Sequence, residues 1–208
     1  MISLLKTIED LKKKSQIKST IKEKISEFES FKNKKINEIF KELCFCIMTA
    51  NCAAEKCIQI HGEIGNDFLT LNEIQLIKKF KELGYRFPNV RAKYILKARE
   101  KISDLQRVLN NYNNHDLRIW ISESILGLGF KEASHFLRNI GYKEYAIIDF
   151  HIVDILKKYN LIEKPKTMSK KKYLEIEYIL KEIANKLDLN LAELDLYLWY
   201  LETGKILR

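Results

Sequence analysis

The sequence contains few of the residues that interrupt helices, with only two prolines and seven glycines among 208 residues. It has no uninterrupted apolar run of about 18 residues, the length that a membrane-spanning helix needs. The amphipathic N-terminus carries acidic residues early and lacks the apolar centre of a secretion signal. We therefore expect no membrane-spanning segment and a cytoplasmic location.

Cysteine is also scarce, and the four cysteines all lie in one stretch between Cys44 and Cys57. Their spacing lacks the closely paired cysteines that are typical of zinc sites. Small buried residues in a reducing compartment are the simpler interpretation. We therefore predict no metal site in this stretch.

Acidic residues are outnumbered by basic ones, 28 to 37, which gives a formal net charge of +9. This balance favours a polyanionic partner, either nucleic acid or an anionic membrane. Lysine-rich composition without such a partner is the alternative. The apolar content of 46% and charged content of 31% are typical of a folded globular chain.

Apolar residues recur at helical spacing almost throughout, and no alternating strand pattern competes with them. The patterns predict an all-α protein of about ten to twelve helices. The capping-box pattern from Thr70 to Glu73 predicts the start of a helix that ends near Gly84. Further helices are expected over residues 103–109, 116–126, 131–140, 150–159, 169–187 and 190–201. Asn190 and Glu193 are in cap positions of the last one.

The stretch LGLGFK, which begins at Leu126, joins two of these helices with almost no loop. Gly127 and Gly129 permit unusual backbone angles and a close approach of another backbone. Exposed amides at such a turn, next to a helix N-terminus, can bind a phosphate without reading a base. The alternative is a tight helical hairpin whose glycines serve packing alone.

Lys131 lies in the first turn of the helix that follows, where the helix dipole disfavours a cation. Such a position in a partly dry cleft favours the neutral amine that a nucleophile needs. An ordinary exposed lysine is the alternative. Asp149 ends the apolar run YAII and begins a helix, so it is either an N-cap, a carboxylate facing a cleft, or both.

These two segments, GLGFK and IIDFHI, resemble the helix-hairpin-helix DNA glycosylase superfamily. The segments GFKEASHFLRNIG and ELDLYLWYLETGKILR are similar to the archaeal-type 8-oxoguanine DNA glycosylase/AP lyases within it. The resemblance covers residues 1–208 and implies a single all-α domain in two lobes with a DNA-binding cleft. The helix-hairpin-helix motif would span about residues 116–140.

The resemblance implies a reaction on a damaged guanine that is flipped out of duplex DNA. Lys131 would attack the sugar C1′, expel 8-oxoguanine, form a Schiff base and cut the strand on the 3′ side by β-elimination. Asp149 would assist as acid, base and electrostatic partner. Gly127 and Gly129 would hold the DNA backbone, where an alkali ion can also bind. No cofactor is expected, and no iron–sulfur cluster, because no cysteine follows Cys57.

Three residues are expected at the base pocket. Relatives commonly end in a lysine that helps to distinguish 8-oxoguanine from guanine, and this chain ends in Arg208, which keeps the cation with a different geometry. Trp199 can stack on the flipped base or belong to the core. His135, one turn after Lys131, can border the pocket or be a structural histidine.

The expected partner is double-stranded DNA containing 8-oxoguanine, bound by a monomer associated with the nucleoid, and no membrane partner is expected. The residues also allow two alternative functions. The first is a glycosylase/lyase for another oxidised base, such as an oxidised pyrimidine. The second is a DNA-binding protein without catalytic activity, which would need neither Lys131 nor Asp149 at these places.

Overall fold

The computed structural model of the protein describes residues 1–207, except for the side chains of Asn114 and His115. This part of the chain forms thirteen α-helices and one 3-10 helix and contains no strand. The predicted all-α class is therefore confirmed. The helices are α1 (Ile2–Lys12), α2 (Ser15–Ser30), η1 (Phe31–Asn33), α3 (Ile36–Thr49), α4 (Ala54–Ile64), α5 (Asp67–Thr70), α6 (Glu73–Glu82), α7 (Pro88–Arg99), α8 (Ile102–Asn111), α9 (Asn114–Ser124), α10 (Phe130–Asn139), α11 (Phe150–Lys158), α12 (Lys170–Lys186) and α13 (Leu191–Thr203).

The described helices outnumber the about ten to twelve that the sequence predicts, so that count was wrong. Two features explain the difference. Helix α5 has only four residues, too few to show a helical period. Helices α1 and α2 are separated by Lys13 and Lys14 alone, and their apolar patterns read as one.

The helix predicted over EIQLIKKFKELG is confirmed as α6, but its predicted cap residue is wrong. Asn72, not Thr70, is its N-cap, and the Asn72 side chain accepts a hydrogen bond from the Gln75 amide at 3.0 Å. The Gln75 side chain accepts the Asn72 amide in return, which completes the capping box two residues later than predicted. Thr70 instead ends α5, so two overlapping capping patterns were present and the short helix before them decided between them.

The chain divides into two compact units, and the boundary between them falls within α10. One unit comprises Met1–Lys32 and the chain from Leu137 onward, and the other comprises Asn33–Phe136. Each unit has its own apolar core. The hairpin with Lys131 belongs to the Asn33–Phe136 unit and Asp149 to the other unit.

Helix α3 is the centre of the Asn33–Phe136 unit, where α4, α5, α7 and α8 contact it. Its second half is buried on every face, as expected for a helix that is apolar all round. Cys44 and Cys46 are fully buried there, and Cys57 is buried in α4. The interpretation as small buried residues is confirmed for these three, whereas Cys52 is partly exposed.

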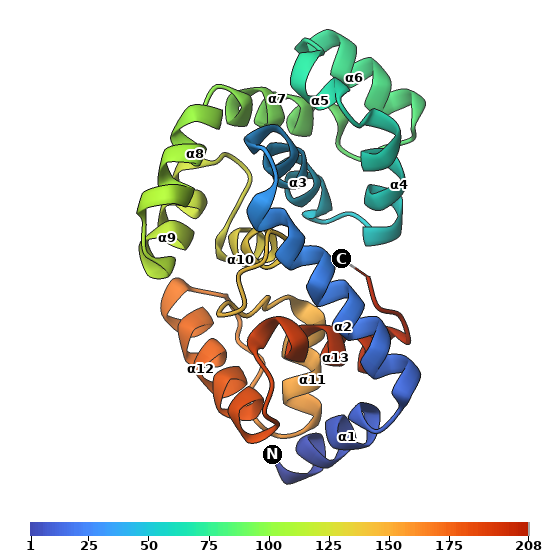
Figure 1. The fold of residues 1–208 in the computed structure, drawn as a ribbon, viewed down its shortest axis with the longest axis vertical. Helices are drawn as coiled ribbons and strands as arrows, with labels where there is room; N and C mark the ends of the chain where they lie inside the picture. The colour runs from blue at the N-terminus through green and yellow to red at the C-terminus, as the bar shows by residue number, and fades with distance from the viewer. Residues whose placement is uncertain (208) are drawn as a thin grey trace. The chain divides into compact units, whose positions relative to one another are not determined.

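Helix α13 has the same role in the other unit, where it contacts α1, α2, α11 and α12 (Figure 1). Its leucines Leu191, Leu194, Leu196 and Leu198 are almost completely buried. A capping box between Asn190 and Glu193 starts this helix, as the sequence predicts.

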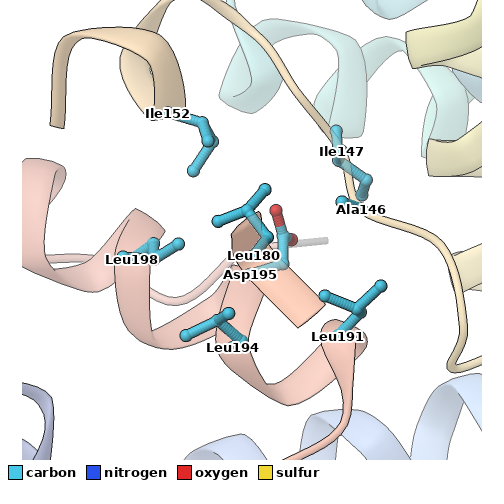
Figure 2. Close-up of a pocket in the computed structure, with 8 residues that line it drawn as sticks. All are labelled: Ala146, Ile147, Ile152, Leu180, Leu191, Leu194, Asp195 and Leu198. Carbon is cyan, nitrogen blue, oxygen red and sulfur yellow. The ribbon is translucent and has the colours of Figure 1, made fainter. Parts of the chain in front are cut away.

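A small hollow lies in this unit among α11, α12, α13 and the segment before α11 (Figure 2). Its enclosed space is about 10 Å³, room for about one water molecule and far less than an ordinary ligand pocket offers. Figure 2 shows Asp195 as its one polar lining residue among leucines, isoleucines and an alanine. Asp195 Oδ2 lies 3.6 Å from Arg138 Nη2, so its charge has a cationic neighbour. We interpret the hollow as a packing feature.

Candidate active site

The hairpin between α9 and α10 is built from one buried apolar residue between two glycines. Leu128 is 4% exposed, and its amide donates to the Ile125 carbonyl at 3.2 Å, which tightens the turn. Gly127 has a φ of +85°, a conformation that residues with a side chain rarely adopt. The tight turn predicted from LGLGFK is therefore present in the structure.

Gly127 is needed for a second reason, which is the close approach of Tyr94 on α7. A Cβ atom on Gly127 would lie 2.4 Å from Tyr94 Cδ2, well inside van der Waals contact. Gly129 differs, because a Cβ there would meet only Glu132 Oε2, at an ordinary 3.5 Å. The two glycines of the motif therefore have different structural requirements.

This difference predicts unequal effects of alanine at the two positions. Gly127→Ala combines an unfavourable φ with a clash against Tyr94, so we expect it to lower the free energy of unfolding by roughly 2–4 kcal/mol. Gly129→Ala is the matched control and should cost less than about 1 kcal/mol. Urea unfolding followed by circular dichroism measures both. Equal stability of the two variants would contradict the role assigned to Tyr94.

Lys131 is the second residue of α10, which confirms its predicted place in the first helical turn. Its side chain is 26% exposed, so the amine is neither free in solvent nor enclosed. Glu132 lies next to it, with Oε1 3.8 Å from Lys131 Nζ. The other carboxylate oxygen, Oε2, accepts the Gly129 amide at 3.3 Å. One carboxylate therefore contacts both the hairpin backbone and the predicted nucleophile.

Helix α4 contributes an uncharged group near Lys131. That group is the buried Cys57 thiol, which donates to the Met48 carbonyl at 3.5 Å and has the Lys131 charge in its surroundings. Burial, together with the neighbouring Cys52 thiol, raises the pKa of Cys57 far above its usual range. Cys57 is therefore a neutral thiol at physiological pH and adds no charge beside the lysine.

His135 lies one turn further along α10 and is only 7% exposed. Its ring packs edge-on against Phe45 of α3, with 5.8 Å between the ring centroids. This contact gives the His135 ring a structural role in the packing of α10 against α3. The part of His135 in base recognition stays a prediction.

Asp149 is the N-cap of α11, because its Oδ1 accepts the Ile152 amide at 3.0 Å. The predicted cap is thus present. The side chain is partly exposed, whereas the four residues before it, Tyr145 to Ile148, are buried. The capping bond fixes the direction of the carboxylate and leaves its second oxygen available for other partners.

Helix α12 holds the extended segment that leads to Asp149. The Tyr173 hydroxyl donates a hydrogen bond to the Ala146 carbonyl at 2.7 Å. It also accepts a hydrogen bond from the Ile148 amide at 3.2 Å. Glu177 accepts the Ala146 amide at 2.9 Å. These buried bonds satisfy a backbone that has no strand partner, and they fix the entry to α11.

Trp199 on α13 lies in a small aromatic group with two residues that follow Asp149. Its ring meets His151 edge-on, with centroids 5.1 Å apart, and His151 in turn lies 3.9 Å from the Phe150 ring. Phe150 is 65% exposed. The indole nitrogen of Trp199 is buried, and no residue among 1–207 accepts its proton. Arg208, the third residue predicted at the base pocket, lies outside the described residues.

The sequence interpretation missed three sets of contacts at this candidate site. Glu132 could have been found, because a glutamate at the third helical position commonly bonds back to the start of its helix. A signal for Glu177 was also present, since it is a carboxylate within the apolar stripe of α12. The approach of Tyr94 to Gly127 left no signal, because the two residues are far apart in sequence.

No group of three or more histidine, cysteine or acidic side chains among the described residues is arranged to hold a metal ion. Over the same residues, no helix is both long enough and apolar enough to cross a membrane.

The fold and the hairpin together define the class of protein. It is an all-helical protein in which a glycine hairpin joins two helices and the second helix carries a lysine in its first turn. This is the arrangement of a helix-hairpin-helix protein.

Comparison with known proteins identifies the family within this class. The 8-oxoguanine DNA glycosylase family (Ogg-HhH) matches residues 21–189. An 8-oxoguanine DNA glycosylase/AP lyase of Methanocaldococcus jannaschii is 51% identical over 207 residues, with 99% of each chain covered. One of Korarchaeum cryptofilum is 46% identical over 94% of each chain. The chain belongs to the 8-oxoguanine DNA glycosylase family, which confirms the resemblance found in the sequence.

A solved structure agrees over the full length of the chain. The crystal structure of the M. jannaschii 8-oxoguanine glycosylase/lyase, in complex with a 15mer DNA containing 8-oxoguanine, is 52% identical. It has a TM-score of 0.96 and covers 100% of both chains. The fold of this protein is thus the fold of a glycosylase that was crystallised on damaged DNA.

Proposed function

We propose that this protein is a bifunctional DNA repair enzyme that excises 8-oxoguanine and then cleaves the strand at the abasic site. The observation that carries the proposal is Lys131, placed in the first turn of α10 directly after a glycine hairpin. The membership of this protein in the 8-oxoguanine DNA glycosylase family supports the same activity. A binding protein without catalytic activity would have no need of an amine at this place.

Lys131 acts as the nucleophile in this proposal. Its neutral amine attacks C1′ of the damaged nucleoside, and the bonding electrons of the N-glycosidic bond leave with 8-oxoguanine. The amine nitrogen then loses a proton, the sugar ring opens, and a Schiff base joins Lys131 to C1′. Loss of a proton from C2′ breaks the C3′–O bond by β-elimination, which cleaves the strand on the 3′ side of the lesion.

Asp149 is the proton carrier and the counter-charge of the sugar in this proposal. Its Oδ1 is occupied by the Ile152 amide, so the carboxylate keeps one orientation through the reaction. The other oxygen can face the positive charge that develops at C1′ as the base leaves. A carboxylate fixed by a helix cap loses little entropy on binding substrate, which suits this task.

The glycine hairpin holds the DNA backbone, and it does so without reading sequence. The amides next to Gly127 and Gly129 lie at the N-terminus of α10, where backbone donors and the helix dipole favour a phosphate. The alkali ion that the resemblance allows at this turn enters no step of the proposal. The positive net charge of +9 adds a general attraction to the duplex.

Trp199, His135 and Arg208 are proposed to recognise the base. The buried indole N–H of Trp199, which no residue among 1–207 accepts, supports a role in binding a polar ligand edge. We further propose that the protein acts as a monomer on duplex DNA and is associated with the nucleoid. The crystallised relative was bound to DNA containing 8-oxoguanine, which supports the choice of substrate.

Excision from defined duplexes tests this function. A labelled duplex with one 8-oxoguanine should be cleaved at the lesion, and a duplex with guanine at that position should stay intact. A duplex with an oxidised pyrimidine tests the alternative that the enzyme acts on another oxidised base. Efficient cleavage of that duplex, with no cleavage at 8-oxoguanine, would contradict the proposed substrate. Binding to all duplexes with no cleavage of any would instead support the non-catalytic alternative.

A further inference from the structure

Glu132 is a carboxylate with two fixed contacts and no role in the function proposed above. Its Oε2 accepts the Gly129 amide at 3.3 Å, so the side chain folds back over the start of its own helix. Its Oε1 then faces Lys131 Nζ at 3.8 Å. The side chain is only 18% exposed, which limits the alternative positions it can take.

The backbone contact alone is an ordinary helix-capping bond, in which a glutamate at the third position returns to the residue before the helix. The position of the second oxygen is the unusual part. A capping glutamate can be followed or preceded by any residue, but here the preceding residue is the proposed nucleophile. The cap therefore holds a negative charge at a fixed place beside the amine.

A negative charge beside an amine has a definite chemical effect. It stabilises the ammonium form, which cannot attack carbon, relative to the neutral amine. Glu132 supplies such a charge at 3.8 Å from Lys131 Nζ, whereas burial keeps the Cys57 thiol neutral. The same carboxylate occupies the Gly129 amide, which lies where a DNA phosphate is proposed to bind.

We propose that Glu132 is a positioning residue that acts through Lys131: its carboxylate, fixed by the Gly129 amide, holds the Lys131 amine at the hairpin in an ion pair until DNA binds. Binding of a DNA phosphate at the Gly129 amide then competes with Glu132 and frees the lysine. This inference rests on the proposed function, because it gives Glu132 a role only if Lys131 is the nucleophile.

Glu132→Gln isolates the charge from the cap, because a glutamine oxygen can accept the Gly129 amide as a glutamate oxygen does. Glu132→Ala removes both the charge and the cap. Glu123→Gln is the matched control, since Glu123 is an exposed carboxylate on α9 and the substitution changes the net charge by the same amount. Thermal unfolding of each variant reports on the cap independently of the chemistry.

The decisive measurement is the second-order rate constant of borohydride trapping on a duplex with a preformed abasic site. It is followed across pH at duplex concentrations well below saturation, because it then reports on the amine of the protein before DNA binds. This substrate needs the amine but no base excision. We expect Glu132→Gln to move the pH of half-maximal trapping down by roughly one unit, the size that an ion pair at this separation gives in water-like surroundings. Glu132→Ala should show the same shift together with a lower Tm, and Glu123→Gln should show neither.

Two results separate the inference from the function on which it rests. If the Glu132→Gln curve superimposes on that of the wild-type protein while Lys131→Ala is not trapped, the function holds and Glu132 is only a helix cap. If Lys131→Ala is trapped as efficiently as the wild type, the proposed nucleophile is wrong and the role of Glu132 fails with it. A shift of equal size in Glu123→Gln would also overturn the inference, since it would reflect net charge alone.

Discussion

Replacing Lys131 with alanine is expected to eliminate the covalent adduct that borohydride traps on 8-oxoguanine DNA. Only a primary amine at the sugar can form the Schiff base, and alanine supplies none. Single-turnover excision should fall by at least about a thousandfold, as for the loss of other enzymic nucleophiles. Denaturing gel electrophoresis of the trapped protein–DNA adduct and of the cleaved strand measures both steps.

The stability of the Lys131→Ala variant should be close to that of the wild type, because the side chain is partly exposed and not part of either core. Lys131→Arg keeps the positive charge but cannot act as an amine nucleophile, so it should bind DNA and remain inactive. Lys158→Ala is the matched control, because Lys158 is an exposed lysine at the end of α11. It should lose one charge and keep full trapping. An adduct that persisted in Lys131→Ala would assign the chemistry to another amine.

Asp149→Asn is expected to bind DNA normally and to lose excision by about a hundredfold or more, the usual contribution of an acid–base group. Asparagine is as good an N-cap as aspartate, so its side chain can still accept the Ile152 amide. The free energy of unfolding should therefore change by less than about 0.5 kcal/mol. The substitution removes the charge and the proton-carrying ability and leaves the local structure intact.

Asp149→Ala is the companion variant, since it also removes the cap. It should lose excision to a similar extent and be less stable by about 1 kcal/mol, the usual value of an N-cap. Fluorescence anisotropy with labelled duplex measures binding, and quench-flow measures the turnover of bound DNA. If Asp149→Asn weakened binding while bound DNA turned over at the wild-type rate, the carboxylate would be a cap without a part in the chemistry.

The parts of the fold that the sequence predicted correctly are governed by short-range rules. The glycine turn before Lys131, the N-cap at Asp149 and the capping box at Asn190 each depend on residues a few positions apart. Such patterns can be recognised in the sequence without knowledge of the tertiary structure. The incorrect cap residue of α6 shows their limit, because overlapping capping patterns at Thr70 and Asn72 could be separated only by the packing around them.

The contacts that hold the candidate site in shape lie beyond that range. Tyr94, on α7, packs so close to Gly127 that no side chain fits at that position. Tyr173 and Glu177 bind the backbone of the segment before Asp149 across more than 20 residues of sequence. Neither relation has a local pattern, because each depends on which helix faces are buried against one another.

The sequence by itself determined the all-helical class, the glycine hairpin with Lys131 after it, and Asp149 as a helix cap. It did so because helix periodicity, turns and caps follow from neighbouring residues. Only the tertiary structure decided that Gly127 packs against Tyr94, that α12 holds the approach to Asp149, and that Glu132 faces Lys131. The reason is physical: side-chain burial and buried hydrogen bonds are satisfied between elements, and their partners are chosen by packing rather than by position along the chain.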